Sequence, residues 1–279
     1  MKLKLGFSPC PNDTFIFDAM IHHKIDTEGL EFEVSFDDVE TLNRKSFSQD
    51  LDITKLSFHA YAYCVSNYVL LDSGSALGYG VGPLVISKQP YDVLGSIGVD
   101  TTVAIPGKFT TASFLFGLAF PHVKNRVEML FSDIEDAVLN GDVGLGLIIH
   151  ENRFTYEQKG LYKVVDLGAF WEEKTGCAIP LGGIAVKRNL NPEIKLKVNR
   201  VIRRSVEYAF ANPQSGIDFI RSHAQAMDDE VMYKHIELYV NKYSVDLGPE
   251  GRSAIELMFS KAVGAGIIPE VKEPLFLYS

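Results

Sequence analysis

The sequence has few cysteines and no pattern among them, which excludes several classes of protein. Its three cysteines, Cys10, Cys64 and Cys177, are odd in number and far apart in a chain of 279 residues. Disulfide-stabilised secreted proteins, zinc modules and dithiol enzymes have cysteines in pairs or at close spacing. We therefore expect reduced thiols, and we expect no metal site.

Charge and hydropathy lack the patterns of nucleic-acid-binding and membrane proteins. The chain has 27 basic and 36 acidic residues, for a net charge of -9, and they are spread without a basic stripe. No apolar run approaches the length of a membrane span, and Pro9 comes too early for the apolar core of a secretory signal. We expect a cytoplasmic protein that binds neither nucleic acid nor membranes. The sequence does not indicate an oligomeric state.

What the sequence does have is a globular composition and enough length for two domains. Hydrophobic residues make up 46% and charged residues 23% of the chain, as in ordinary globular proteins. Glycines precede two apolar segments, 84–86 and 184–187, and we interpret both as strands on which the chain crosses between domains. The predicted architecture is an α/β fold with a discontinuous larger domain, residues 1–87 and 182–279, and an inserted smaller α/β domain, residues 88–181.

The turn at residues 8–17 contains the densest group of candidate site residues. Apolar and other residues alternate over residues 2–7, as in a strand, and two prolines then favour an extended turn that leads into a helix. Asn12 and Asp13 therefore lie at a helix N-terminus, where backbone amides and the helix dipole favour an anionic or hydroxyl-rich small molecule. For one such turn taken alone, a simple helix cap is the better explanation of Asp13.

Polar residues also stand at the ends of three further predicted strands. They are Ser57 at the end of strand 51–57, the turn with Thr110 and Thr111 after strand 103–106, and His150 after the apolar strand 145–149. Ligands of open α/β sheets bind outside the carboxyl ends of the strands. We therefore expect these strand ends, together with the first turn, to converge on one cleft between the lobes.

One helix of the smaller domain has clear local boundary signals. Ser132 and Glu135 have the spacing of a capping box for a helix over 133–139, and the Asn140-Gly141 pair follows it as a typical C-terminal stop. These signals predict that Glu135 takes part in a helix cap.

Six blocks of the chain carry a resemblance to a known family. They are SPCPNDTFIF at 8–17, DVETLN at 38–43, TKLS at 54–57, GYGVGPL at 78–84, PGKFTTA at 106–112 and LIIHE at 147–151. Together they resemble the 1,4-dihydroxy-6-naphthoate synthases, which belong to the futalosine route to menaquinone. The resemblance covers nearly all of the first 185 residues in order, and it implies the two-lobed fold of type II periplasmic binding proteins with two hinge crossovers.

The resemblance also implies an activity. It implies a cytoplasmic lyase that converts cyclic dehypoxanthinyl futalosine to 1,4-dihydroxy-6-naphthoate and dihydroxyacetone. The implied reaction uses neither a metal nor an organic cofactor. The expected partner is a small-molecule carboxylate substrate.

The resemblance assigns roles to matching residues of this chain. His150 matches the catalytic base of the family, which places a histidine general base in the expected cleft. The matching substrate-binding segments are Lys55, Leu56 and Ser57, and Thr111 with Ala112. We extend a role in the pocket to Asp13, Asn43 and Thr110, because they lie inside the same blocks. In chemical terms, helix amides at 111 and 112 suit a carboxylate, and the other polar groups suit hydroxyls.

Two other functions stay open on the sequence alone. Chorismate dehydratase shares the pathway and the fold, although the blocks at 9–17 and 147–151 argue against it. A noncatalytic small-acid solute-binding protein shares the two lobes, but it needs export or a lipid anchor, for which we find no signal. A lone histidine such as His150 is in general more often structural than catalytic. Its only rival as a base is His59, which is close to Ser57 but enters a helix.

Overall fold

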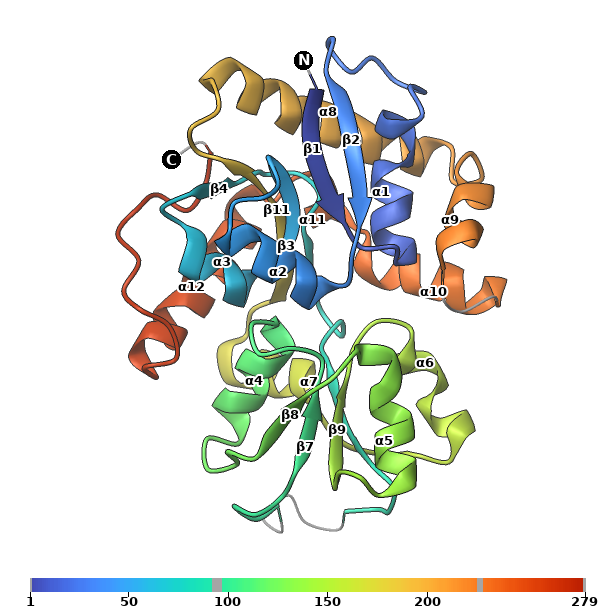
Figure 1. Cartoon of the computed structure of the whole chain (residues 1–279), viewed down its shortest axis with the longest axis vertical. Helices are drawn as coiled ribbons and strands as arrows, with labels where there is room; N and C mark the ends of the chain where they lie inside the picture. The colour runs from blue at the N-terminus through green and yellow to red at the C-terminus, as the bar shows by residue number, and fades with distance from the viewer. Residues whose placement is uncertain (1, 92–96, 225–227, 278–279) are drawn as a thin grey trace. The chain divides into compact units, whose positions relative to one another are not determined.

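The chain folds into two compact units. The computed structural model describes residues 2–91, 97–224 and 228–277, and Figure 1 shows the course of the chain. Unit 1 consists of Met1–Gly78 and Pro180–Ser279, and unit 2 consists of Tyr79–Ile179. The chain therefore passes between the units twice.

The unit boundaries differ from the ones that the sequence suggested. The chain divides after residues 78 and 179, where we expected divisions after 87 and 181. The reason is the pairing of β6 (Leu84–Ser87), which forms antiparallel ladders with β9 (Leu145–Ile148) and β10 (Tyr162–Asp166). Because both partners belong to unit 2, β6 is part of the unit 2 sheet and not a strand that connects the units.

Unit 1 is built on a mixed sheet. Within the described residues its strand order is β2-β1-β3-β11-β4, and β5 pairs with β11. The strands are β1 (Lys2–Phe7), β2 (Glu31–Phe36), β3 (Ile53–Ser57), β4 (Tyr68–Leu70), β5 (Ala76–Gly78) and β11 (Ile179–Lys187). The strand β1 is parallel to β2 and β3, whereas β11 is antiparallel to β3 and β4. The carboxyl ends of β1 and β3 therefore lie at the same edge of the sheet.

The helices of unit 1 come from both parts of the chain. They are α1 (Pro11–Ile21), α2 (Val39–Phe47), α3 (Phe58–Cys64), α8 (Pro192–Ala211), α9 (Ile217–His223), α10 (Asp229–Tyr239), α11 (Lys242–Val245) and α12 (Gly248–Gly264). Helix α1 packs against α8, α9 and α10, and α2 packs against β1 and β3. In α8, Val198, Val201, Ile202 and Val206 are buried at helical spacing in the same apolar core as Leu5 of β1.

Unit 2 has a second mixed sheet with helices on it. The strand order is β10-β6-β9-β7-β8, with β7 (Val103–Ile105) parallel to both β9 and β8 (Arg126–Glu128). Its helices are α4 (Thr111–Ala119), α5 (Ile134–Asn140), α6 (Asn152–Thr155) and α7 (Leu167–Thr175), with 3-10 turns η2 (Phe131–Asp133) and η3 (Tyr156–Lys159). Helix α5 packs on β9, β7 and β6, and α4 packs against α7. Strand β9 is buried at every position, which explains its continuous apolar sequence.

The three cysteines form no disulfide, as we expected from their number and spacing. Cys64 lies at the end of α3 and is fully buried. Burial raises the pKa of its thiol to about 11, so the group stays protonated and unreactive at neutral pH. Within the described residues, no helix has the length and apolar character that a membrane span requires.

Two glycines of unit 2 bring backbone segments unusually close together. A Cβ built on Gly82 would lie 2.2 Å from the Cα and the backbone N of Gly168, which is the second residue of α7. Backbone atoms cannot move aside as the end of a flexible side chain can. The glycine-rich segment before β6 is therefore a place of close backbone packing.

We expect Gly82→Ala to destabilise the protein by about 2 kcal/mol or more, because the added methyl group must push two backbone segments apart. Urea unfolding followed by circular dichroism measures this loss. The matched control is Gly98→Ala in the same unit, where a Cβ meets nothing within 4 Å. Equal stability of the two variants would contradict the close approach of Gly82 and Gly168.

Candidate functional site

The turn between β1 and α1 places an acidic side chain inside unit 1. Cys10 is the N-cap of α1 in an extended conformation, and Pro11 occupies the first helical position, where proline is well tolerated. Asp13 follows in the first turn of the helix and is only 2% exposed. The predicted helix N-terminus is therefore present, and it holds a carboxylate that is nearly removed from solvent.

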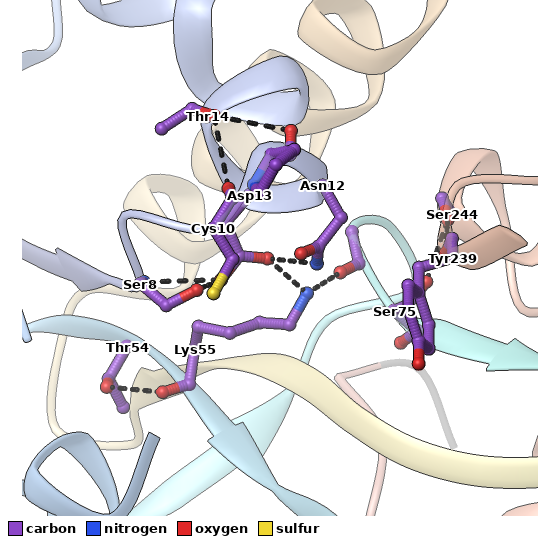
Figure 2. Close-up of polar contacts among 12 residues, drawn as sticks. Ser8, Cys10, Asn12, Asp13, Thr14, Thr54, Lys55, Ser75, Tyr239 and Ser244 are labelled. Carbon is purple, nitrogen blue, oxygen red and sulfur yellow. Dashed lines mark hydrogen bonds and ion pairs between the residues drawn. The ribbon is translucent and has the colours of Figure 1, made fainter. Parts of the chain in front are cut away.

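Asp13 is the acceptor at the centre of a buried network (Figure 2). Its Oδ2 accepts hydrogen bonds from the backbone N and the Oγ of Ser8, at 3.2 and 2.8 Å. Its Oδ1 accepts one from Asn12 Nδ2 at 2.9 Å and forms an ion pair with Lys55 Nζ at 2.9 Å. Four donors on two carboxylate oxygens satisfy this charge well, as a buried carboxylate requires.

Lys55 lies in the middle of β3 with its ammonium group fixed from two sides. Besides its ion pair with Asp13, Nζ donates to the carbonyl oxygen of Gly74 at 2.9 Å. Gly74 has φ +88°, and a Cβ there would lie 2.0 Å from Ile184 Cδ1, so only glycine brings this carbonyl to the ammonium. An ammonium has three N–H groups, and within the described parts of the chain two of them have acceptors. The third has no acceptor among the described residues.

Asn43 and Ser57 form a second polar pair in unit 1. Asn43 Oδ1 accepts a hydrogen bond from the backbone N of Ser57 at 2.9 Å, and its Nδ2 donates to Ser57 Oγ at 3.2 Å. Both residues are buried, and Asn43 comes from α2 whereas Ser57 is the last residue of β3. Because Ser57 Oγ accepts from Asn43, its own O–H can still donate to a ligand. Leu56, between Lys55 and Ser57, is 1% exposed and belongs to the interior.

In unit 2, the predicted turn before α4 is a helix cap. Thr110 is the N-cap, and its Oγ1 accepts from the backbone N of Ser113 at 3.2 Å and donates to the Gly107 carbonyl at 2.9 Å. Thr111 and Ala112 are the first two residues of α4 and are nearly buried. The first N–H groups of a helix have no acceptor within the helix, and they carry the positive end of its dipole. An anion is the ligand that such groups favour.

His150 follows β9 in a strained backbone conformation. Its φ is +57°, in the left-handed region that residues other than glycine seldom occupy. Its ring contacts that of Phe131 with the centroids 4.9 Å apart, and the residue is half-buried. A backbone of this kind persists only where the surrounding structure holds it, and such positions cluster at active sites.

The loop after His150 is anchored by the residues that follow it. Asn152 Nδ2 donates to Glu135 Oε2 at 2.8 Å, and Arg153 forms an ion pair with Asp166 at 2.7 Å. Glu135 is 1% exposed and also pairs with Lys159 at 2.7 Å.

The predicted capping box of Ser132 and Glu135 is therefore wrong. Asp133 is the N-cap of α5, and its side chain makes no capping hydrogen bond. Glu135 lies in the interior, where its carboxylate accepts from Asn152 and Lys159 and so holds this loop.

Unit 1 contains two further histidines of interest, the rival candidate base His59 and the buried His235. His59 is 6% exposed in α3, where its ring contacts Tyr63 with the centroids 5.6 Å apart. His235 in α10 is fully buried, and its Nε2 is 2.9 Å from Asn12 Oδ1. Nothing in the local sequence of His235 distinguishes it from other helical residues, so sequence alone does not indicate a role for it. Only the packing of α10 on α1 places it beside the candidate site.

Comparison with known proteins gives a consistent result over the whole chain. A family model described as menaquinone biosynthesis matches residues 3–263. A 1,4-dihydroxy-6-naphthoate synthase from Thermus thermophilus is 46% identical over 275 residues, which cover 99% of each protein. A second one, from Streptomyces coelicolor, is 38% identical and covers 96% of this chain and 95% of that protein.

Solved structures show the same fold. A crystal structure of a protein from Archaeoglobus fulgidus matches with a TM-score of 0.90 and 35% identity, over 96% of this chain and 98% of that one. The alkanesulfonate-binding protein SsuA from Xanthomonas axonopodis matches with a TM-score of 0.72, over 96% and 94% of the two chains. At 9% identity the second match shows the fold alone. The predicted periplasmic-binding-protein-like α/β fold is therefore confirmed.

We expect Asp13→Asn and Lys55→Met each to lower the free energy of unfolding by about 3 kcal/mol, because each leaves one buried charge without its partner. The double variant should lose less than the sum of the two, because it buries no unpaired charge. Lys242→Met is the control, since its ion pair with Glu250 is exposed to solvent and should contribute little to the free energy of unfolding. Strictly additive losses, measured by urea unfolding, would show that Asp13 and Lys55 do not act as a pair.

Proposed function

The chain belongs to the menaquinone biosynthesis family whose model it matches, and from this premise we propose that it is a 1,4-dihydroxy-6-naphthoate-forming lyase. The proposed reaction converts cyclic dehypoxanthinyl futalosine to 1,4-dihydroxy-6-naphthoate and dihydroxyacetone. The observation that carries the proposal is the 46% identity to the Thermus thermophilus synthase over the full length of both proteins. Identity over the full length of both proteins supports a shared activity more strongly than a shared fold does, because fold alone does not determine function.

The chemistry of the proposed reaction needs a base more than it needs a cofactor. A proton leaves the polyhydroxylated ring of the substrate, a three-carbon piece departs, and formation of an aromatic ring supplies much of the driving force. We assign the base to His150, because imidazoles in general titrate near ~6.5 and can accept a proton at physiological pH. The strained backbone at φ +57° supports this assignment. The proposal includes no step through a metal or an organic cofactor.

The polar groups of the two units have different proposed roles. In unit 2, the N-terminus of α4 with Thr110, Thr111 and Ala112 is proposed to bind the aromatic carboxylate. In unit 1, the segment Lys55, Leu56 and Ser57 is proposed to bind sugar-derived hydroxyls. Asn43 and Asp13 support that segment through the contacts described above.

The location of the reaction is part of the same proposal. The substrate is derived from a nucleoside and carries a carboxylate, so it does not cross a lipid bilayer unaided. We therefore propose that the protein acts in the cytoplasm, where such a precursor is made.

A direct assay tests the activity. Purified protein is incubated with cyclic dehypoxanthinyl futalosine, and the naphthoate and dihydroxyacetone are identified by mass spectrometry. A parallel incubation with chorismate tests the dehydratase alternative. Binding of the cyclic substrate without any product would favour a solute-binding protein, and turnover of chorismate would favour the dehydratase.

We expect His150→Asn to lower turnover by about 10²- to 10⁴-fold while substrate binding stays close to that of the wild type, as for loss of a general base. Asparagine is the suitable replacement because it tolerates the left-handed backbone, so the loop conformation at φ +57° is kept. His59→Asn is the comparison, since His59 is the other candidate base. Near-normal turnover of His150→Asn would refute the assignment of the base.

We expect Thr111→Pro to raise the apparent KM for the cyclic substrate while the protein stays folded, because the substitution deletes one amide donor at the first position of α4. Proline suits this position, and the extended Thr110, with φ -71° and ψ 150°, is already compatible with a following proline. Thr111→Ala keeps the amide and removes the hydroxyl, so it separates the two groups. Unchanged affinity of a folded Thr111→Pro variant would count against an anion site at this helix end.

A further inference from the structure

We infer that His235 is a positioning residue for the proposed reaction, which acts through Asn12 to hold the Asp13–Lys55 pair in place for the substrate. The inference rests on the proposed function, and it concerns a residue of the C-terminal helices. His235 lies in α10 and is 223 residues away from Asn12 in the sequence. Its Nε2 lies 2.9 Å from Asn12 Oδ1, and Asn12 in turn contacts Asp13, so we infer that it acts through Asn12.

The hydrogen bonds of this network have one consistent direction. Asn12 Nδ2 donates to Asp13 Oδ1 at 2.9 Å, because an ionised carboxylate only accepts. The other atom of the Asn12 amide, Oδ1, is therefore an acceptor, and the atom 2.9 Å from it is His235 Nε2. It follows that His235 carries its proton on Nε2 and donates to Asn12. A donor at this position is required for the network to be satisfied.

The network ends at the group that is available to a ligand. Asp13 Oδ1 receives both Asn12 Nδ2 and Lys55 Nζ, so the orientation of Asn12 helps to set the place of that oxygen and of the ammonium. Lys55 is held on its other side by the Gly74 carbonyl. All of these side chains are buried, where hydrogen bonds strengthen one another and an unmade bond is costly. A displaced Asn12 would therefore move the Lys55 ammonium away from its set direction.

A purely structural role makes a different prediction for conservative substitutions. A buried histidine that serves only packing is replaced best by an aromatic ring such as phenylalanine. A histidine that serves as the Nε2 donor is replaced best by glutamine, whose amide nitrogen lies near the place of Nε2. The comparison of His235→Phe with His235→Gln separates the two roles.

The experiment measures steady-state turnover of cyclic dehypoxanthinyl futalosine by the two variants. We expect His235→Phe to lower kcat/KM about tenfold, mainly through a higher KM, and His235→Gln to stay within about threefold of the wild type. Ile236→Val is the matched control, because it makes a small cavity in the same helix and the same core. Ile236→Val should lower the stability of the protein as His235→Phe does, but it should not lower kcat/KM.

A double variant tests the path through the network. In a Lys55→Met background, His235→Phe should cause less than about a twofold further loss of kcat/KM, because the group that it positions is already absent. A further tenfold loss in that background would overturn the inference. So would equal kcat/KM in His235→Phe and the wild type.

A measurement without substrate separates this inference from the proposed function. The Lys55 side-chain signal is followed by NMR in protein labelled with ¹³C at the lysine Cε, and it is assigned with Lys55→Arg. We expect the signal to shift in His235→Phe and to stay unchanged in His235→Gln and Ile236→Val. Wild-type protein that converts no cyclic substrate refutes the proposed function and leaves this result intact, whereas an unchanged signal in His235→Phe refutes the positioning role itself.

Discussion

The buried ion pair between Asp13 and Lys55 is the constraint on which the candidate site of unit 1 depends. Two charges removed from water are tolerated only when they are paired with each other and their remaining valences are satisfied. This requirement explains the donors from Ser8 and Asn12 and the glycine whose carbonyl reaches the ammonium. A buried pair of this kind seldom adds stability compared with an apolar pair of the same size. What the pair does provide is a Lys55 ammonium held in one direction, an arrangement suited to binding a small molecule.

In unit 2, the backbone conformation of His150 and the contacts of the following loop fix the candidate group, whereas a buried ion pair does so in unit 1. His150 keeps a left-handed backbone, which is costly for a side chain other than glycine. The loop that follows it is held by Asn152 on a buried glutamate and by Arg153 on Asp166. In both units the chain leaves a buried strand and enters a helix within a few residues, so polar groups are fixed by two rigid elements at once. The fold supplies these junctions to many proteins, and the side chains placed there decide the chemistry.

The parts of this structure that the sequence predicts are the local ones. The strand–turn–helix junctions at Asp13, Ser57 and Thr110 follow from alternation, proline and polar turn residues within about ten positions. Long-range pairing was not predictable in this way. The strand β6 belongs to unit 2 because of partners about 60 to 80 residues later in the chain, and Glu135 is an interior acceptor because Asn152 and Lys159 reach it. No window of local sequence contains those partners.

The C-terminal helices show why a site can depend on residues that carry no local signal. Helix α1 presents Asp13, but its position is set by helices that come much later in the chain. Ser205 of α8 donates to the Ile16 carbonyl at 2.6 Å and accepts from the Met20 amide at 3.2 Å, inside the core. Helix α10 adds the contact of His235 with Asn12 at the other end of α1. A shift of α1 would move Asp13 and the ammonium paired with it, so the geometry of the candidate site depends on the whole helical packing of unit 1. The short sequence blocks around Asp13 and Lys55 specify these groups but not their positions.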